Sequence, residues 1–311
     1  MMLVEHRDAP PAGTDGPLVS ILSPVRDEQR HLPSMLDNVL ASTWTRFEVV
    51  LVNDGSTDHT AEILADYAGR DHRVKVVGSG AAIGKVAAFN AAYAASTGQI
   101  ICHVGGDDTI PTDALAHRVR ALSPHLGQRA VAFFKLELFD QLPGDRPVVV
   151  PRGRHGSMSG PSITMTRQLA EAVMPIPSHL VSEDIWMGNA ADALAQVRVD
   201  SDAVVVHYRR HAGNSNPRSK SFTGMSDAIH ARMQALDALL ETDRFDLPPV
   251  HRERLEAEVA AEGLRRDGRT VALLRSDLPP IDRVAVASMS NPLLWRVRST
   301  LLTPLTGWRG R

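Results

Sequence analysis

The stretch FEVVLVNDGSTDHT, residues 47–60, decides the fold. Its apolar first half, FEVVLVND, has the pattern of a buried strand, and the turn-forming residues GSTD follow at once. A helical pattern, TAEILADYAGR, comes next. We expect Ser56 or Thr57 to cap that helix, because a hydroxyl oxygen can accept a bond from a free N–H at a helix start. A strand that turns directly into a helix is the repeating unit of doubly wound α/β sheets.

The same alternation of strands and helices continues on both sides of this stretch. Strands are expected at LVSILSP (18–24), VKVVG (74–78) and QIICHV (99–104), and helices at HLPSMLDNVLAST (31–43) and KVAAFNAAYAAST (85–97). This alternation predicts an α/β protein with a doubly wound, mostly parallel sheet flanked by helices. Ligands bind at the carboxyl ends of the strands in such sheets. The polar segments of the chain stand at those ends: SPVRDE (23–28), NDGSTD (53–58) and GGDD (105–108).

The rest of the chain divides into a strand-rich middle and a helical end. In the middle, strands are expected at 130–140, at 147–150 before a mobile loop, at 162–166 before a helix, and at 197–211 as one long strand or a pair; a helix capped by Ser182 is expected at 182–195. From about Ser221 the pattern is helical. We therefore expect a disordered leader over 1–16, an α/β domain over 17–220 and a helical extension with a basic, apolar tail over 221–311.

Composition limits the functions that remain. The 311 residues carry a net charge of −2, so no overall positive field favours nucleic acid as a partner. Cys102 is the single cysteine, which excludes a disulfide or a cysteine-based zinc site within the chain. The first residues, MMLVEHRDAPPAGTDGP, have acids and prolines where a signal peptide needs an apolar core, so a cytoplasmic location is expected. The longest uncharged run, 86–106, is too polar for a membrane span.

The glycine-rich segment VVGSGAAIGKVAAFN, residues 76–90, is close to two nucleotide-binding motifs and matches neither. A P-loop needs glycine where this chain has Ser79, and serine or threonine where it has Val86. The dinucleotide fingerprint G-x-G-x-x-G is one residue shorter than the G-x-G-x-x-x-G found here, although Asp107 lies where a ribose-binding acid would follow. By itself the segment also suits a plain turn between a strand and a helix.

Acidic residues after the first two strands bear on this choice. A dinucleotide fold carries its glycines on the first strand–helix turn, whereas here they follow the third strand. The first two turns carry Glu28 and Asp54, which can bond a base or a ribose but repel a pyrophosphate. A nucleotide bound there needs a cation for its phosphates, and Asp107 and Asp108 are candidate carboxylate ligands.

Five motifs in this order resemble the family 2 glycosyltransferases, which have the GT-A fold. They are VSILSPVRDE, VVLVNDGSTDHT, GKVAAFNAAYAASTGQIICHVGGDD, SEDIWMG and YRRHAGN. The second is the most specific for that family, and the resemblance extends from Leu18 to Asn214. It implies an inverting glycosyltransferase that uses a nucleotide sugar. On this interpretation the glycines of segment 76–90 form the turn into a helix behind the donor site, and not a dinucleotide cradle.

The resemblance also implies roles for single residues. In the donor site, Pro24, Val25 and Asp54 line the pocket for the nucleotide base, with Glu28 nearby. The other implied roles are Asp107 at the donor ribose or sugar, Asp108 on a divalent metal (Mn²⁺ or Mg²⁺) and Asp184 as catalytic base. The expected mechanism adds Arg209 or Arg210 at the phosphates. Glu183 is expected to act through acceptor contacts or through the electrostatics of the helix start. Lys85 either reaches the donor or stays solvated at its helix start.

One departure from the family pattern concerns the metal. Many members carry a further acid where Gly105 stands, so that metal binding here rests on fewer carboxylates. His211 is expected to compensate, because a neutral imidazole can bind Mn²⁺.

The expected reaction moves a sugar from a UDP-, dTDP- or GDP-sugar to an acceptor hydroxyl by a metal-assisted single displacement with inversion. The acceptor can be a glycan, a lipid carrier or a small natural product. Two alternatives stay open: a module that binds sugar nucleotides without turnover, and a nucleotidyltransferase on a similar sheet. The intact Glu183–Asp184 pair argues against the first, and SPVRDE lacks the basic, glycine-rich loop that the second needs. Each motif alone also suits a turn, a helix cap or first-turn acids.

The tail NPLLWRVRSTLLTPLTGWRGR, residues 291–311, mixes tryptophans and leucines with arginines and has no acid. This composition is typical of a segment at a membrane surface, here the inner face. A C-terminal helix packed on the domain, or on a second copy in a homodimer, is the alternative. Pro292 and Pro304 are expected to keep any helix in the tail short.

Overall fold

The structure is a computed structural model that describes residues 15–78, 80–140, 147–210 and 221–306. Its contacts divide the chain into two compact units, Met1–Arg210 and His211–Arg311, and each is described by itself. Most of the expected leader, and the residues just before the expected boundary at 220, lie outside the described residues.

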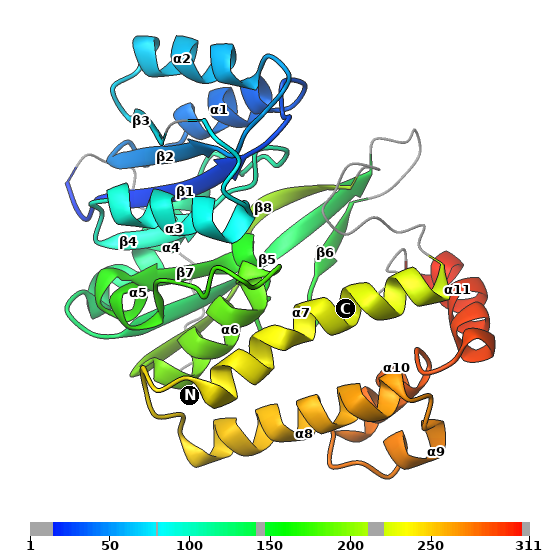
Figure 1. Cartoon of the computed structure of the whole chain (residues 1–311). Helices are drawn as coiled ribbons and strands as arrows, with labels where there is room; N and C mark the ends of the chain where they lie inside the picture. The colour runs from blue at the N-terminus through cyan, green and yellow to red at the C-terminus, as the bar shows by residue number, and fades with distance from the viewer. Residues whose placement is uncertain (1–14, 79, 141–146, 211–220, 307–311) are drawn as a thin grey trace. The chain divides into compact units, whose positions relative to one another are not determined.

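The first unit alternates strands and helices as the sequence predicts (Figure 1). Its elements are β1 (Val19–Val25), α1 (Leu32–Leu40), β2 (Phe47–Asn53), α2 (Thr60–Arg70), β3 (Val74–Val77), α3 (Lys85–Ala95), β4 (Ile100–His103), α4 (Ala114–Leu122), the 3₁₀ helix η1 (Ser123–His125), β5 (Ala130–Asp140), β6 (Val148–Val150), the 3₁₀ helix η2 (Gly160–Ser162), β7 (Ile163–Thr166), α5 (Arg167–Val173), α6 (Glu183–Leu194) and β8 (Val197–Arg210). Segment 197–210 is therefore one long strand and not a pair.

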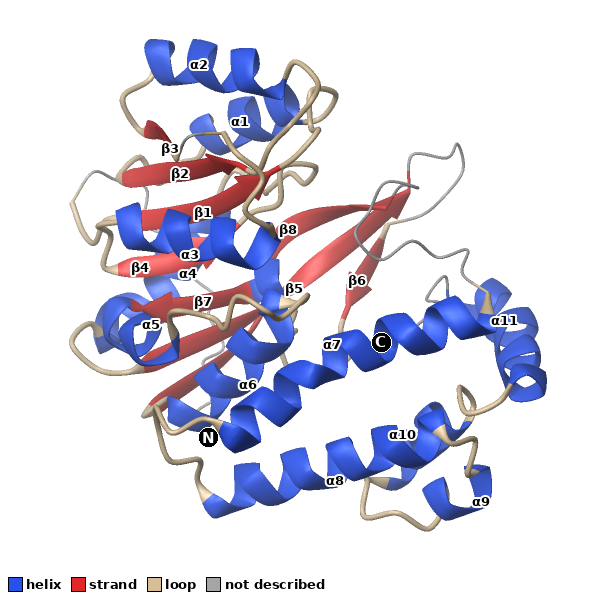
Figure 2. Cartoon of the chain, viewed as in Figure 1, coloured by secondary structure: helices blue, strands red, loops and turns tan. Residues whose placement is uncertain are grey.

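One mixed sheet forms the centre of the first unit, in the order β3-β2-β1-β4-β7-β5-β6, with β8 also paired to β5. Strands β1 to β4 are mutually parallel, β8 runs parallel to β5, and β7 and β6 are antiparallel to their neighbours. Helices lie on both sides of the sheet (Figure 2). The expected α/β class with a mostly parallel sheet is confirmed.

The strands of the parallel half are buried because helices cover both of their faces. All seven residues of β2 are buried, as a continuous apolar run predicts for a strand in such a sheet. Val19 and Ile21 of β1 pack with α1, α2 and α4 in one core cluster. Leu22, which points to the opposite face, is also buried and lies outside that cluster.

A buried carboxylate, Glu48, ties the amino ends of the parallel strands together. It accepts hydrogen bonds from Ser20 Oγ on β1 (2.6 Å) and from Thr97 N in the α3–β4 loop (2.6 Å), and it pairs with Lys75 of β3. Burial raises the pKa of Glu48, but the bonds from Lys75, Ser20 and Thr97 outweigh burial and lower the pKa below its usual value.

Two cap predictions are wrong in detail. Helix α2 begins at Thr60, too far along the chain for Ser56 or Thr57 to cap it, and Asp58 Oδ1 accepts from Thr60 N (3.0 Å) instead. Ser182 does occupy the N-cap position of α6, but its hydroxyl makes no cap bond and donates to Asp184 Oδ1. In both places an aspartate competes successfully for the polar partners, as its charged oxygens are the stronger acceptors.

The second unit is helical, as expected, and consists of α7 (Phe222–Glu241), α8 (Pro249–Arg266), α9 (Thr270–Leu273), α10 (Pro280–Ala287) and α11 (Pro292–Thr306). Buried Arg265 of α8 pairs with Glu262 (2.6 Å) and donates to Ser226 O on α7 (3.2 Å), which joins these two helices. Helix α11 is longer than expected, because it begins at Pro292 and includes Pro304 in its last turn. None of the described helices combines the length and hydropathy needed to cross a bilayer.

Candidate active site

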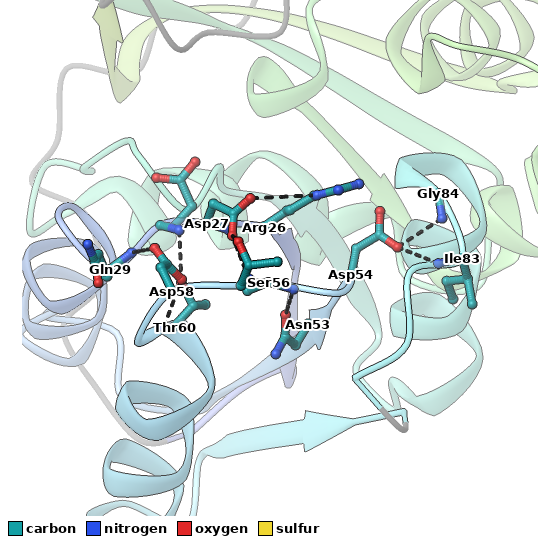
Figure 3. Close-up of polar contacts among 12 residues, drawn as sticks. Arg26, Asp27, Gln29, Asn53, Asp54, Ser56, Asp58, Thr60, Ile83 and Gly84 are labelled. Atoms are coloured by element: carbon teal, nitrogen blue, oxygen red, sulfur yellow. Dashed lines mark hydrogen bonds and ion pairs between the residues drawn. The ribbon is translucent and has the colours of Figure 1, made fainter.

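The loops that follow β1 and β2 are bonded to each other through their polar residues (Figure 3). Asp27, whose φ is 53°, donates its N–H to Ser56 Oγ (3.0 Å) and accepts from Thr57 N (2.7 Å). Asp58 Oδ2 accepts from Gln29 N (3.0 Å). The SPVRDE and NDGSTD motifs therefore form one rigid rim at the carboxyl end of the sheet.

Asp54 connects this rim to the glycine-rich turn after β3. Its Oδ1 accepts from Ile83 N (2.6 Å) and Gly84 N (2.8 Å), as Figure 3 shows. Gly84, with a φ of 90°, is the N-cap residue of α3. The glycine turn thus leads into a helix, as expected. Oδ2 of Asp54 accepts no hydrogen bond from the described residues, which leaves it available to a ligand.

The GGDD loop after β4 lies close against the end of β1. A Cβ atom at Gly106 would stand 2.8 Å from Val25 Cγ1 and 3.2 Å from Glu28 Cγ, so only glycine allows this approach. Val25 itself is buried in the core cluster, while Pro24 is half-buried. Of these two sequence candidates, Pro24 is the better exposed toward a ligand.

An acidic cluster lies where these loops meet, and it consists of the carboxylates of Glu28, Asp107 and Asp108. Burial, followed by the charges of Asp107, Asp58 and Asp27, raises the pKa of Glu28 to about 7. Burial and the charge of Asp107 also raise the pKa of Asp108, which is only 1% exposed. Such mutual repulsion is relieved by a cation bound nearby.

Arg209 of β8 is the basic residue that the structure brings to this acidic cluster. Its backbone N–H donates to Asp108 Oδ1 (2.9 Å), and its Nε donates to Asp107 O (2.8 Å). The guanidinium lies 4.9 Å from the centre of the Phe139 ring, which helps to hold it in place. The strand β8 reaches the loop through paired bonds between Thr109 and His207.

The two aspartates of GGDD fit a divalent cation only in part. Their carboxylates are the oxygen ligands that Mg²⁺ and Mn²⁺ prefer, but within the described parts of the chain no group of three His, Cys, Asp or Glu side chains is placed to hold a metal. Asp107 Oδ1 and Asp108 Oδ2 lie 2.8 and 2.9 Å from the Cβ position at Gly105, so they fill the space of a side chain there. A cation would complete its shell with water or phosphate oxygens. The expected ligand His211 lies outside the described residues.

A second group of charged residues lies at the start of α6. Glu183 Oε1 pairs with Lys85 Nζ of α3 at 2.7 Å, with the Glu183 side chain buried and that of Lys85 half exposed. Asp184 Oδ1 accepts from Ser182 Oγ and from Ile185 N (2.9 Å). Glu183 Oε1 therefore meets a cation, and Asp184 Oδ1 meets a hydroxyl and a backbone amide.

His103, the last residue of β4, is a functional candidate that the sequence analysis missed. A Cβ at Gly160 would stand 3.2 Å from His103 Nδ1, 3.6 Å from Asp184 Cβ and 3.9 Å from Glu183 Oε1. Burial, followed by the charges of Lys85 and Arg118, lowers the pKa of His103 to about 3. Its one sequence signal is a histidine in the apolar strand QIICHV, directly before GGDD.

Two polar atoms in this second group are buried without a hydrogen-bond partner among the described residues. They are His103 Nδ1 and Glu183 Oε2, and both residues have side-chain atoms close to Gly160. Buried polar groups are nearly always bonded, so a ligand or a water is expected there. Since β4 carries His103 at its end and GGDD just beyond, one strand brings the acidic cluster and the Glu183–Asp184 group to the same edge of the sheet.

Comparison with known proteins shows which family the sequence around this edge resembles. Residues 20–130 match the model of glycosyl transferase family 2. The uncharacterized glycosyltransferase EpsJ of Bacillus subtilis is 38% identical over 94 residues, which are 30% of this chain and 27% of that protein. Glycosyltransferase GlyA of Streptococcus pneumoniae is 33% identical over 95 residues, 30% of this chain and 14% of that protein. The match thus spans less than a third of either relative.

Solved structures extend the likeness beyond that segment. TarS of S. aureus in complex with UDP-GlcNAc has a TM-score of 0.61 at 19% identity and covers 92% of this chain and 84% of its own. The mannosyltransferase PcManGT from Pyrobaculum calidifontis, in complex with GDP-Man and Mn²⁺, has a TM-score of 0.60 at 17% identity and covers 97% of this chain and 85% of its own. Residues 20–130 therefore resemble glycosyl transferase family 2, and the chain has the fold of these glycosyltransferase structures, GT-A.

Proposed function

We propose that the protein transfers a sugar from a nucleotide-diphosphate sugar to an acceptor hydroxyl, with inversion at the anomeric carbon. One observation carries this proposal. At the end of β4, an acidic cluster suited to a diphosphate and its cation lies at the same sheet edge as the Asp184 carboxylate, which is suited to proton removal. The nucleotide sugars bound by TarS and PcManGT support the donor class. UDP-, dTDP- and GDP-sugars are the candidates.

The donor is proposed to bind across the rim. Asp54 Oδ2 accepts from the base while Oδ1 stays on the glycine turn, so that donor binding does not disturb α3. Glu28 and Asp107 accept hydrogen bonds from hydroxyl groups of the ribose or sugar. Arg209 supplies positive charge at the phosphates, held near them by its bonds to the GGDD loop.

Asp107 and Asp108 would hold a divalent cation, Mn²⁺ or Mg²⁺, whose charge would neutralise the diphosphate as it departs. The buried Asp108 is fixed in orientation by the bond from Arg209 N. The Mn²⁺ in PcManGT supports this cofactor class.

Asp184 is proposed as the base. It takes the acceptor proton while the acceptor oxygen bonds the anomeric carbon and the bond to the diphosphate breaks. The bonds from Ser182 and Ile185 fix the direction of its carboxylate. Glu183 is unsuited to this step because its side chain is buried and its Oε1 is paired with Lys85 Nζ.

A nucleotide-sugar screen tests the proposal. Thermal shifts are measured with UDP-, dTDP- and GDP-sugars in Mn²⁺, and the best donor is then assayed for release of nucleoside diphosphate with glycan, lipid-linked and small-molecule acceptors. The expected result is stabilisation by one nucleotide class and release of its diphosphate. Binding without turnover would instead indicate a binding module, and release of pyrophosphate a nucleotidyltransferase.

A further inference from the structure

The last three helices of the second unit expose aliphatic side chains in pairs. The pairs are Val271 and Leu274 on α9 and its end, Ile281 and Val284 on α10, and Leu293 and Val297 on α11. Their exposed fractions run from 46% for Leu274 to 84% for Ile281. They are six of the eleven large hydrophobic residues that are exposed in the described parts of the chain, and they fall within residues 271–297. We call these six residues the C-terminal apolar surface.

Two of the helices that carry this surface, α9 and α10, are already packed on their inner side. Leu273, Leu278 and Ala287 are buried in a small core cluster with α8. An ordinary surface helix turns polar residues outward once its apolar face is buried. Here spacings of three or four residues put aliphatic side chains on the outer side as well, and the inner core does not account for them.

Hydrogen bonds connect the segments that carry these exposed pairs. Arg298 Nη1 of α11 donates to Ser288 Oγ at the end of α10 (2.8 Å). Thr270 Oγ1 of α9 bonds Ser290 Oγ (2.6 Å), and Asn291 Oδ1 accepts from Leu294 N at the start of α11 (3.0 Å). The exposed pairs therefore do not result from fraying of the helix ends.

The charge of this part of the chain is opposite to that of the rest. Residues 268–311 contain seven arginines and two aspartates and no other Asp, Glu or Lys, a net charge of +5. The whole chain carries −2, so residues 1–267 carry −7. Arg275 and Arg296 are exposed beside the aliphatic pairs, and no acid follows Asp282.

We propose that the C-terminal apolar surface docks on an anionic lipid bilayer. Aliphatic side chains add binding free energy when they enter the acyl boundary of the bilayer, and arginines add it when they pair with lipid phosphates. A second copy is disfavoured as the occupant because two copies of segment 268–311, each with a net charge of +5, repel each other. Since none of the described helices can span a bilayer, the contact lies in the interface plane.

Vesicle sedimentation of the full-length protein tests this proposal. The probes are vesicles of phosphatidylglycerol with phosphatidylcholine, and of phosphatidylcholine alone. We expect binding to the anionic vesicles that falls about tenfold or more in Ile281→Gln/Val284→Gln, since two exposed aliphatic groups lose their insertion. Val250→Gln is the matched control, because Val250 is 68% exposed on α8, outside the surface.

The charge contribution has its own variants. Arg275→Gln/Arg296→Gln is expected to lower binding to anionic vesicles about 10- to 30-fold, at about 1 kcal/mol for each arginine near the bilayer. Arg266→Gln, an exposed arginine of α8, is the control and is expected to bind as wild type. Added salt should weaken wild-type binding in the same direction.

Several results would overturn the docking proposal. Equal binding of wild type and Ile281→Gln/Val284→Gln would do so, and so would equal binding to neutral and anionic vesicles. If light scattering shows a dimer that Ile281→Gln/Val284→Gln abolishes, the surface binds a second copy of the chain. Binding that rises with salt would exclude attraction between the arginines and the lipid phosphates. No donor is used, so these results are independent of the proposed sugar transfer.

Discussion

At the residue scale, Glu183 and Asp184 are neighbours on α6 with different environments. Glu183 is buried on Lys85, and Asp184 bonds a hydroxyl and a backbone amide. Neighbouring residues of a helix point about 100° apart, so the two carboxylates cannot perform the same step. The bonding pattern favours Asp184 as the base and Glu183 as a residue that positions the start of α6 against α3.

Asp184→Asn keeps the shape and the polarity of the helix start but cannot take a proton. We expect turnover to fall by about 10² to 10⁴, the usual range for a general base. Donor affinity should stay within a few-fold, because a base acts in the transition state. Glu183→Gln should reduce turnover less. Steady-state rates and donor dissociation constants decide: turnover near wild type in Asp184→Asn would refute the assignment, and loss of donor binding alone would move Asp184 to the nucleotide pocket.

His103 offers a prediction in which stability and activity move in opposite directions. Its Nδ1 is buried without a partner among the described residues, which costs about 1–3 kcal/mol if no water compensates. His103→Leu should therefore leave the folded protein as stable as wild type or more so. If Nδ1 bonds a substrate hydroxyl, the same variant should lose tenfold or more in kcat/KM, and His103→Gln should recover part of it.

The pH dependence of stability provides a check on His103. Its folded pKa of about 3 is below the usual 6.5, so between these values the unfolded chain binds the extra proton and stability falls as pH falls. His103→Leu should flatten the dependence of the unfolding free energy on pH in this window. A slope identical to wild type would mean that His103 is solvated in solution. Unchanged kcat/KM in His103→Leu would remove it from the site.

At the element scale, Glu48 joins β1, β3 and the α3–β4 loop to β2. Glu48→Gln removes the charge that holds Lys75 and should destabilise the protein by about 1–3 kcal/mol. The folded pKa of Glu48 is below its usual 4.5, so its contribution is present above pH 4.5 and is lost as pH falls through the folded pKa. Wild type and variant should thus converge in acid.

Denaturant unfolding at several pH values measures this difference. Glu62→Gln is the matched control, because Glu62 pairs with His59 on the exposed face of α2 and surface pairs contribute about 0–1 kcal/mol. A constant gap between wild type and Glu48→Gln from neutral pH to acid would show that the charge of Glu48 does not stabilise the sheet.

Local patterns allowed most elements to be predicted, because a helix or strand depends on the period of its apolar residues. Helix α2 and strand β5 begin and end where the pattern indicated. The caps were less predictable. Ser56, Thr57 and Asp58 are all capable acceptors, and only the meeting of the β1 and β2 loops decides that Ser56 receives the N–H of Asp27 while Asp58 takes that of Thr60.

At the scale of the whole molecule, long-range pairing set the limit of prediction. The rule that ligands bind at the carboxyl ends of parallel strands correctly indicated which loops would meet. It could not indicate that β8 returns beside β5, pairing Ala130 with Val197, and so carries Arg209 to the GGDD loop. The pairing of Lys85 with Glu183 and the burial of His103 likewise depend on packing between distant segments, which leaves no local signature.

Removal of metal tests the whole domain as a binding unit. A ligand that binds only the folded state stabilises it by about 2.7 kcal/mol at a hundredfold excess over its Kd. Donor with Mn²⁺ should therefore raise the Tm of the protein, and excess EDTA should remove most of that rise. Asp108→Asn should weaken the Mn²⁺-dependent part, because it takes one anionic oxygen from the acidic cluster. Asp66→Asn, on the exposed side of α2, is the control and should respond as wild type. Donor binding and turnover that persist unchanged in EDTA would contradict the metal assignment. The charge repulsion among Glu28, Asp107 and Asp108 would then be relieved by protonation, since their environment already raises the pKa of Glu28 and of Asp108.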